Sequence, residues 1–307
     1  VKHDPQSPDV VAFSPELVWP QIFRNKLALE LSNSFLVMAS PSMGHIVDPS
    51  ILAYHYSTNR ISQYVKETVF VTQANKTISV NCRKLYPRAG IEHSTNTVKH
   101  SLVEKSPYIN GHLLSLEFTQ IVIRDGWLVD EVGAFYHRYL GFFDKILMKE
   151  VPSSRISWVK NKSRRLDDKL PGKFFDISPQ NIVIDENGSG IVIDHEWELT
   201  NEVELGFCLF RSALLMMGAV SRFGTNGDNI RYSRREFIQD TFMAANFIID
   251  DAQIDDYREQ EALIQTQITG KSVENFLDWS ADHVMQTKNL TSVLADRDAT
   301  IKHLDWL

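Results

Sequence analysis

Three polar residues in the middle of the chain have the types and the spacing that phosphoryl transfer requires. Asp176 and Asn181 lie in the segment Phe-Phe-Asp-Ile-Ser-Pro-Gln-Asn, and Asp194 follows two short β-branched runs. Phosphoryl transfer needs a carboxylate that orients the accepting hydroxyl and takes its proton, and oxygen ligands that hold Mg²⁺ against the phosphates. Asp176 could serve as the carboxylate, and Asn181 and Asp194 could serve as the metal ligands.

A predicted β-hairpin brings these residues together. Residues 182–185 and 191–193 have the pattern of two strands, and the intervening Glu-Asn-Gly-Ser-Gly is rich in turn-forming residues. The hairpin would return Asp194 to the side of Asn181, as two ligands of one metal ion require. The alternative is a turn in which the Asp and Asn side chains bond only their own backbone.

The segment 171–198 also resembles the catalytic and metal-binding segments of aminoglycoside phosphotransferases and choline kinases. More closely, it resembles the kinase-like domain of bacterial proteins that join a methyltransferase to a kinase and modify O-antigen or related surface glycans. This resemblance implies ATP and Mg²⁺ as cofactors and Asp176 as the catalytic base. Asn181 and Asp194 would be Mg²⁺ ligands, with Glu196 as an additional one. His-Glu follows Asp194 where protein kinases have Phe-Gly, which favours a small-molecule or sugar kinase.

The composition is that of a folded enzyme. The chain has 307 residues, of which 43% are hydrophobic and 23% are charged, enough for one large core or two lobes. Its net charge of −7 gives no general attraction to nucleic acid or anionic lipid. Cys82 and Cys208 lie in apolar contexts, which indicates free thiols in a reducing compartment and a cytoplasmic location.

Transmembrane segments are not expected, because the sequence contains no apolar run of the length that spans a bilayer. Association with the inner membrane surface through partners stays open.

The first part of the chain is rich in predicted strands, which cover residues 51–56, 67–72 and 77–85. Three antiparallel strands are what a kinase-like N lobe begins with. The loop between the first two strands would then cover the nucleotide. It contains no glycine, so Ser57, Thr58 and Arg60 would have to contact the phosphates in place of freely approached backbone amides.

The third strand should carry a lysine that reaches the phosphates. Alternation places Val80, Cys82 and Lys84 on one face, which makes Lys84 the candidate over Arg83. The alternative is that Lys84 occupies the exposed end of a strand. A glutamate that pairs with this lysine would be Glu92.

A hinge between two lobes is predicted in residues 102–111, a strand that runs into a turn marked by proline. Tyr108 and Ile109, followed by Gly111, match the family's habit at this position, where the backbone would bond the edge of adenine. Ordinary loops have a similar composition.

Helices are predicted over residues 16–31, 115–123, 129–148 and 205–217. The aromatic residues of the third helix are expected in the core. Arg211 interrupts an otherwise apolar helix, and a buried arginine needs a carboxylate partner, for which Glu196 or Glu198 is expected. Basic residues in segments 160–165 and 222–235 either lie in solvated loops or meet an anionic substrate.

These patterns predict an α+β protein of the two-lobed protein-kinase-like fold, with a small antiparallel β N lobe and a mainly helical C lobe. The N lobe would cover residues 46–108 and the C lobe residues 109–289. Residues 1–45 resemble the tail of a preceding methyltransferase-like domain. Residues 290–307 resemble the start of a coiled coil that would organise oligomers. The chain is therefore expected to be part of a longer multidomain protein.

The expected function is ATP- and Mg²⁺-dependent phosphorylation of a sugar hydroxyl, at the terminal residue of a bacterial O-antigen or other surface glycan. Two alternatives stay open. The first is a pseudokinase that keeps the fold as a nucleotide-binding or scaffolding module, which the missing glycines favour. The second is an aminoglycoside- or choline-type kinase, which an acidic acceptor pocket would support.

Overall fold

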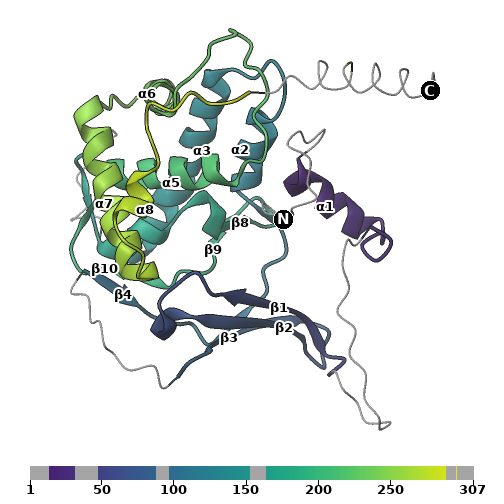
Figure 1. The fold of residues 1–307 in the computed structure, drawn as a ribbon. Helices are drawn as coiled ribbons and strands as arrows, with labels where there is room; N and C mark the ends of the chain where they lie inside the picture. Colours follow the sequence, from purple (N-terminus) through teal and green to yellow (C-terminus); the bar gives the residue numbers. More distant parts are fainter. Residues whose placement is uncertain (1–13, 32–47, 88–96, 153–163, 288–294, 296–307) are drawn as a thin grey trace, which may run out of the picture.

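The computed structural model describes residues 14–31, 48–87, 97–152 and 164–287, together with residue 295. In these residues the protein is a mixed α+β structure, with an antiparallel sheet in the N-terminal part and most helices later (Figure 1). Several predictions fall outside the described residues. They are Glu92, the basic residues 160–163 and, apart from residue 295, the coiled coil at 290–307.

The three strands predicted in the N-terminal part are confirmed as β1 (Ile51–Ser57), β2 (Lys66–Thr72) and β3 (Ile78–Lys84). A fourth strand, β5 (Lys105–Pro107), extends the sheet, whose order is β1-β2-β3-β5 with antiparallel pairs throughout. Val80, Cys82 and Lys84 share one face of this sheet, as alternation predicts, because they lie opposite Phe70, Thr68 and Lys66 in the register.

Smaller sheets connect this sheet to the rest of the molecule. A three-stranded sheet consists of β6 (His112–Leu113), β8 (Ile182–Ile184) and β9 (Gly190–Val192). Two strand pairs join β4 (Val98–His100) to β10 (Trp197–Leu199) and β7 (Lys169–Leu170) to β11 (Val203–Glu204). The β4–β10 pair fastens the chain just before β5 to the segment just after the β8–β9 hairpin.

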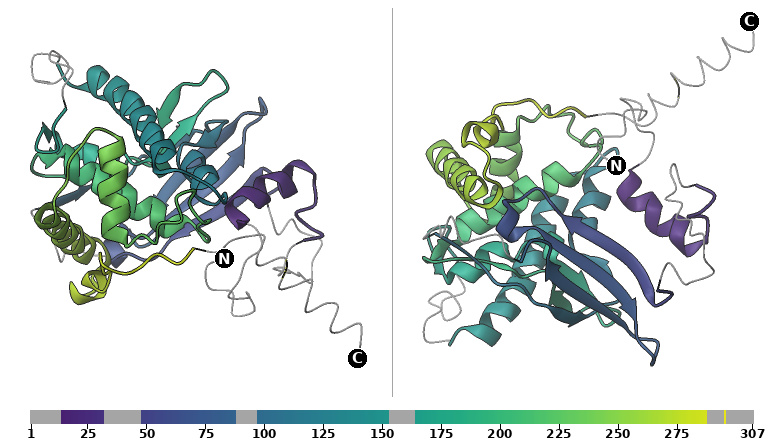
Figure 2. Two further views of the ribbon diagram at one scale, coloured as in Figure 1. Left: turned by 90° about the horizontal axis from the view of Figure 1, so that it is seen from above. Right: turned by 60° about the horizontal axis from the view of Figure 1, so that its bottom comes forward.

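Three of the predicted helices are confirmed as α2 (Ser115–Val122), α3 (Val129–Glu150) and α5 (Leu205–Ala219). The structure adds α6 (Arg234–Ala244), α7 (Asp251–Thr269) and α8 (Glu274–Leu277), which the sequence analysis did not predict. Capping boxes at Ser233 and Asp250 start two of these helices. Figure 2 shows the helices from α2 onward gathered on one side of the β1–β3 sheet.

The first helix is shorter than predicted. It is α1 (Pro15–Arg24), whereas its apolar periodicity continues to residue 31. The chain leaves the helix at Asn25, and Lys26 has a φ of 61°, in the left-handed region that ends right-handed helices. Backbone conformation therefore overrides the apolar pattern here.

The core lies between α3, α5 and the segment that precedes the β8–β9 hairpin. Phe135, Tyr139, Phe142 and Phe143 of α3 are buried, which confirms the prediction that they belong to the core. The Tyr139 hydroxyl donates to the carbonyl of Ile177 at 2.5 Å, so it fixes the loop that carries Asp176 and Asn181. Among the described residues, no helix is both long enough and apolar enough to cross a membrane.

Candidate functional site

The β8–β9 hairpin forms as predicted and sets Asp194 next to Asn181. Ile182 lies opposite Val192, and the Ile193 N–H donates to the Asn181 carbonyl at 2.8 Å. Asp194 follows directly, with a φ of 50° and a side chain that is 50% exposed. The hairpin thereby brings Asp194 and Asn181 to the same end.

Asp176 closes the 3₁₀ helix η3 (Gly172–Asp176) and is buried. Its backbone carbonyl accepts a hydrogen bond from Asn181 Nδ2 at 2.9 Å, and its Oδ2 accepts one from the Trp197 N–H at 3.3 Å. Burial raises the pKa of the Asp176 carboxyl to about 6, and the nearby charges of Arg211 and His195 only partly oppose this. The group is thus more basic than an ordinary aspartate.

Arg211 is the buried cation beside Asp176. Its Nη1 lies 3.9 Å from Asp176 Oδ1, its Nε lies 3.2 Å from Glu261 Oε2, and its guanidinium sits 4.5 Å from the centre of the Phe175 ring. The expected partners Glu196 and Glu198 were wrong, because α7 supplies the carboxylate and the sequence analysis did not predict α7.

Lys66 is the functional candidate that the sequence analysis missed. Its side chain is only 3% exposed, and its ammonium pairs with Asp194 Oδ1 and, at 2.8 Å, with Glu196 Oε2. Burial alone would lower the pKa of Lys66, but the two carboxylates outweigh it and raise the pKa. In the structure Lys66 lies directly opposite Lys84 and on the same face, a pairing between strands that the sequence analysis did not derive.

Glu196 holds three side chains that carry or can carry positive charge. Its Oε1 lies 2.6 Å from Arg60 Nη1, and its Oε2 lies 2.8 Å from Lys66 Nζ and 3.2 Å from His100 Nε2. Burial would raise the pKa of Glu196, but the hydrogen bonds from His100 and Lys66 and the neighbouring charges lower it to about 2. Both carboxylate oxygens already have cationic partners, an arrangement that differs from the predicted role of metal ligand.

Of the residues predicted to contact the nucleotide, Ser57 and Lys84 lie at one end of the N-terminal sheet, on either side of Lys66, and Tyr108 lies toward the other end. Ser57 is half-buried at the end of β1 and Thr58 is exposed, while Arg60 pairs with Glu196 and lies over the Trp197 ring. Lys84 is exposed at the end of β3, as the alternative reading of this residue expected.

At the predicted hinge, the Tyr108 N–H donates to the Ile78 carbonyl at 3.0 Å. This amide therefore belongs to the sheet and is not free to bond an adenine edge. Ile109 follows it and is half-buried.

Several arginines of the two basic segments form contacts within the protein. Arg164 pairs with Asp144, and Arg165 pairs with Asp167 at 2.9 Å. The Arg222 guanidinium donates to the Ile123 carbonyl at 2.5 Å. Arg235 pairs with Asp255 at 3.1 Å and with Asp282 at 2.7 Å. Arg222 and Arg235 thus join loops and helices of the C-terminal part.

A metal ion at this site would take some of its ligands from a bound molecule rather than from the protein. Within the described residues, no group of three or more His, Cys, Asp or Glu side chains could hold a metal ion. Asn181 and Asp194 nevertheless fit Mg²⁺, which binds one or two protein carboxylates and takes its remaining oxygens from phosphates and water. The donor set at the hairpin end is of this kind.

Comparisons with known proteins found no relative. No protein-family model matches this chain, and neither the curated proteins nor the solved structures gave a match. The function must therefore be argued from the site itself.

Proposed function

We propose that this protein transfers the γ-phosphoryl group of ATP, with Mg²⁺, to a hydroxyl of a sugar at the end of a bacterial surface glycan such as O-antigen. One observation carries the proposal. The bond from Asn181 to Asp176 and the β8–β9 hairpin set a candidate base and two candidate metal ligands side by side. These are the groups that phosphoryl transfer needs, since catalysis of this reaction consists mainly of positioning and charge stabilisation.

Asp176 is suited to act as the general base. With a pKa of about 6, it is mostly ionised at neutral pH and still binds a proton more readily than an ordinary aspartate. Its carboxylate would orient the acceptor hydroxyl and take the proton that the hydroxyl loses. Trp197 and Arg211 hold the carboxylate in place for that step.

Asn181 and Asp194 would hold Mg²⁺, which supplies charge neutralisation at the phosphates when bound. Lys66 places a second positive charge beside Asp194. A buried ammonium at this position would stabilise negative charge on a transferred phosphoryl group, and Glu196 would keep that ammonium in position.

The choice of a sugar acceptor rests on the resemblance of segment 171–198 to the kinase-like domains of glycan-modifying proteins. A cytoplasmic location belongs to the same proposal, because ATP is available there and Cys82 and Cys208 are free thiols.

A transfer assay tests this function. The protein is incubated with Mg²⁺ and ATP labelled in the γ-phosphate, against a panel of monosaccharides and O-antigen fragments. We expect label to move to a saccharide, and Asp176→Asn to abolish the transfer. Asp185→Asn is the matched control, because Asp185 only caps the turn of the same hairpin. Equal transfer by wild type and Asp176→Asn would refute the assignment of the base.

A nucleotide-binding pseudokinase is the second candidate, and one observation favours it. Lys66 pairs directly with Asp194, so the candidate metal ligand already has a cationic partner. This alternative predicts that the protein binds ATP and phosphorylates no saccharide of the panel.

A further inference from the structure

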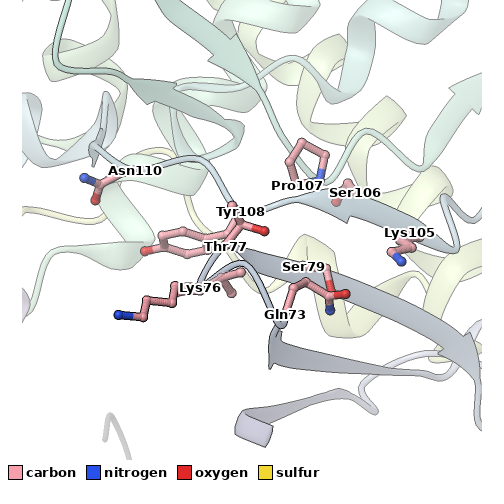
Figure 3. Close-up of a pocket in the computed structure, with 10 residues that line it drawn as sticks. Gln73, Lys76, Thr77, Ser79, Lys105, Ser106, Pro107, Tyr108 and Asn110 are labelled. Atoms are coloured by element: carbon pink, nitrogen blue, oxygen red, sulfur yellow. The ribbon is translucent and has the colours of Figure 1, made fainter. Parts of the chain in front are cut away.

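A cavity of about 790 Å³ lies at the edge of the N-terminal sheet (Figure 3). Its walls are the turn between β2 and β3, the start of β3, and β5 with the residues that follow it. This volume falls in the range of small-molecule sites in proteins. Tyr108, which the sequence analysis placed at a nucleotide-binding hinge, lines the cavity, but its backbone N–H is bonded to the Ile78 carbonyl, so the proposed phosphoryl transfer does not use this space.

The cavity is remote from the candidate transfer site. Strand β2 begins at Lys66, which pairs with Asp194, and ends at Thr72, next to the cavity residue Gln73. A strand rises about 3.3 Å per residue, so about 20 Å separate the two ends of β2. A ligand in the cavity would therefore be distinct from the phosphoryl group at Asp194.

The charge of the cavity points to an anionic ligand. Among the described residues that line it, the only charged ones are Lys76 and Lys105. They stand at opposite ends of the cavity, since Lys76 lies in the β2–β3 turn and Lys105 of β5 lies opposite Asn81, further along β3 (Figure 3). The whole chain carries a net charge of −7, so this pair of lysines is a local exception to the overall electrostatics.

The remaining walls carry polar groups that are already held in place. Gln73 Nε2 donates to the buried Ser79 Oγ at 2.8 Å, and the turn is closed by the bond from the Gln73 N–H to the Thr77 carbonyl at 2.7 Å. On the other wall, Asn110 Nδ2 donates to Glu186 Oε1 at 3.0 Å. Fixed amide and hydroxyl groups suit a ligand with several hydroxyls, because little ordering is needed on binding.

An aromatic ring completes the site. The Tyr108 side chain is 47% exposed, and its ring centre lies 6.2 Å from that of Phe70 in an edge-to-face arrangement. Figure 3 shows this ring beside Thr77 and Lys76. Such a ring offers an apolar face to one side of a ligand and a polar hydroxyl at its rim.

We propose that this cavity binds an acidic saccharide, a sugar ring that carries a carboxylate or phosphate group. One of the two lysines, Lys76 or Lys105, would pair with the acidic group, and the amides and hydroxyls of Gln73, Ser79 and Asn110 would bond the sugar hydroxyls. The Tyr108 ring would cover the C–H face of the sugar. This site is additional to the proposed transfer site and does not depend on transfer taking place.

Calorimetric titration of the full chain with defined probes tests the site. The probes are glucuronic acid and glucose 6-phosphate, with glucose as the neutral control. We expect both acidic sugars to bind up to about fivefold more tightly than glucose, since one exposed ion pair is worth at most about that factor. Equal binding of glucose, or no binding of the acidic sugars up to tens of millimolar, overturns the proposal.

Charge-matched variants then locate the site. The double variant Lys76→Gln/Lys105→Gln should lose the preference for acidic sugars, whereas Lys149→Gln/Lys271→Gln, which changes two exposed lysines outside the cavity, should keep it. If Lys149→Gln/Lys271→Gln alone loses the preference for acidic sugars, or if neither double variant loses it, the assignment of the cavity as the binding site is wrong.

Two further titrations separate this site from other anion sites. Asp194→Ala should bind the acidic sugars as the wild type does, even if the proposed phosphoryl transfer fails. Inorganic phosphate should bind more weakly than glucose 6-phosphate. If phosphate binds as tightly, or if the Lys76→Gln/Lys105→Gln variant loses binding of ATP with Mg²⁺, the cavity is a general anion or nucleotide site and the proposal is wrong.

Discussion

Asp176 is buried beside a guanidinium, and the balance of these two effects determines when it is ionised. The folded protein raises the pKa of Asp176 from 3.8 to about 6 because burial outweighs the attraction of Arg211. The folded state therefore holds this proton more firmly than the unfolded chain does. The contribution of Asp176 to the free energy of unfolding falls as the pH rises through this window, by about 3 kcal/mol in total, and stays low above it.

We expect Asp176→Asn to remove this pH dependence. Urea unfolding of the wild type and of the variant between pH 4 and 7 measures it, and the variant should gain stability relative to the wild type as the pH rises. Parallel stability curves would contradict the buried, raised pKa. If Asp176 is also the base, the transfer rate of the wild type should fall as the pH drops below about 6, because the protonated carboxyl cannot accept another proton.

The sequence and the structure favour different lysines, Lys84 and Lys66, as the one that contacts the nucleotide. The sequence favoured Lys84, whereas the structure buries Lys66 against Asp194 and leaves Lys84 exposed. We expect Lys66→Gln to weaken binding of ATP with Mg²⁺ by at least about tenfold, since bonds to a charged group contribute about 1.5–3 kcal/mol. Lys84→Gln should have a smaller effect. Calorimetric titration of both variants with ATP and Mg²⁺ measures the two effects. A larger loss of binding in Lys84→Gln than in Lys66→Gln would favour Lys84 as the nucleotide contact.

The sequence could predict Asp176, Asn181 and Asp194 as a group because they lie on one local hairpin. It could not predict Lys66, because a lysine at the start of a strand has the same local pattern whether it is exposed or buried. Its burial depends on Asp194 and Glu196, which lie far along the chain. Long-range charge pairing leaves no local signal.

The element that positions Asp176 is η3, and its first residue must be glycine. A Cβ on Gly172 would lie 1.8 Å from the Leu199 carbonyl oxygen, a backbone atom that cannot turn aside. Gly172→Ala should therefore shift η3 away from β10 and lower the free energy of unfolding by about 1–3 kcal/mol, with loss of transfer activity. Chemical denaturation and the transfer assay measure the two effects.

Gly141→Ala is the matched control for this substitution. Gly141 lies in α3, and a Cβ there would meet nothing within 4 Å. Alanine at this helical position should stabilise the protein by up to about 1 kcal/mol, because it lowers the entropy of the unfolded chain. Equal stability of the two variants would contradict the close contact between Gly172 and the Leu199 carbonyl oxygen.

Strong local patterns predicted the elements that surround the site. Alternation gave β1 to β3, helical periodicity gave α3, a capping serine indicated α2, and a continuous apolar run indicated α5. The helices α6 and α7 are less amphipathic, and their signals were the capping boxes at Ser233 and Asp250. Without α7 the carboxylate of Glu261 could not be assigned to Arg211. An incomplete set of elements thus led directly to a wrong contact.

At the scale of the whole molecule, Glu196 joins the N-terminal sheet to the segment after the hairpin. It pairs with Lys66, the first residue of β2, with Arg60 in the loop before β2, and with His100 on β4. Its pKa is lowered from 4.5 to about 2 because these partners outweigh burial. This carboxylate therefore stabilises the fold fully above about pH 4.5, and the stabilisation is lost as the pH falls toward 2.

Glu196→Gln should lower the free energy of unfolding at pH 7 by about 3 kcal/mol, because it leaves buried cations without their counter-charge. The stability of the variant should also depend less on pH between 4.5 and 2 than that of the wild type. Glu198→Gln, two residues further along the chain in β10, is the control and should change stability little. Thermal unfolding at several pH values measures both variants. Equal behaviour of the two would contradict a linking role for Glu196.

The mixed α+β class and the order of sheet and helices followed from the sequence, since alternation and helical periodicity change near residue 112. The two-lobed kinase-like arrangement could not be derived from these local patterns, because it depends on how the sheet and the helices face each other around a ligand. That relation is set by contacts between distant segments, such as β4 with β10, which local patterns do not report.

The most direct test of the central claim is calorimetric titration of ATP into the full chain, with and without Mg²⁺, for the wild type and for Asp194→Ala. Asp185→Ala, in the turn of the same hairpin, is the control. The account predicts Mg²⁺-dependent binding in the wild type and in the control, and its loss in Asp194→Ala. Absence of ATP binding by the wild type, or unchanged binding by Asp194→Ala, would contradict a metal-assisted phosphoryl-transfer site at the end of this hairpin.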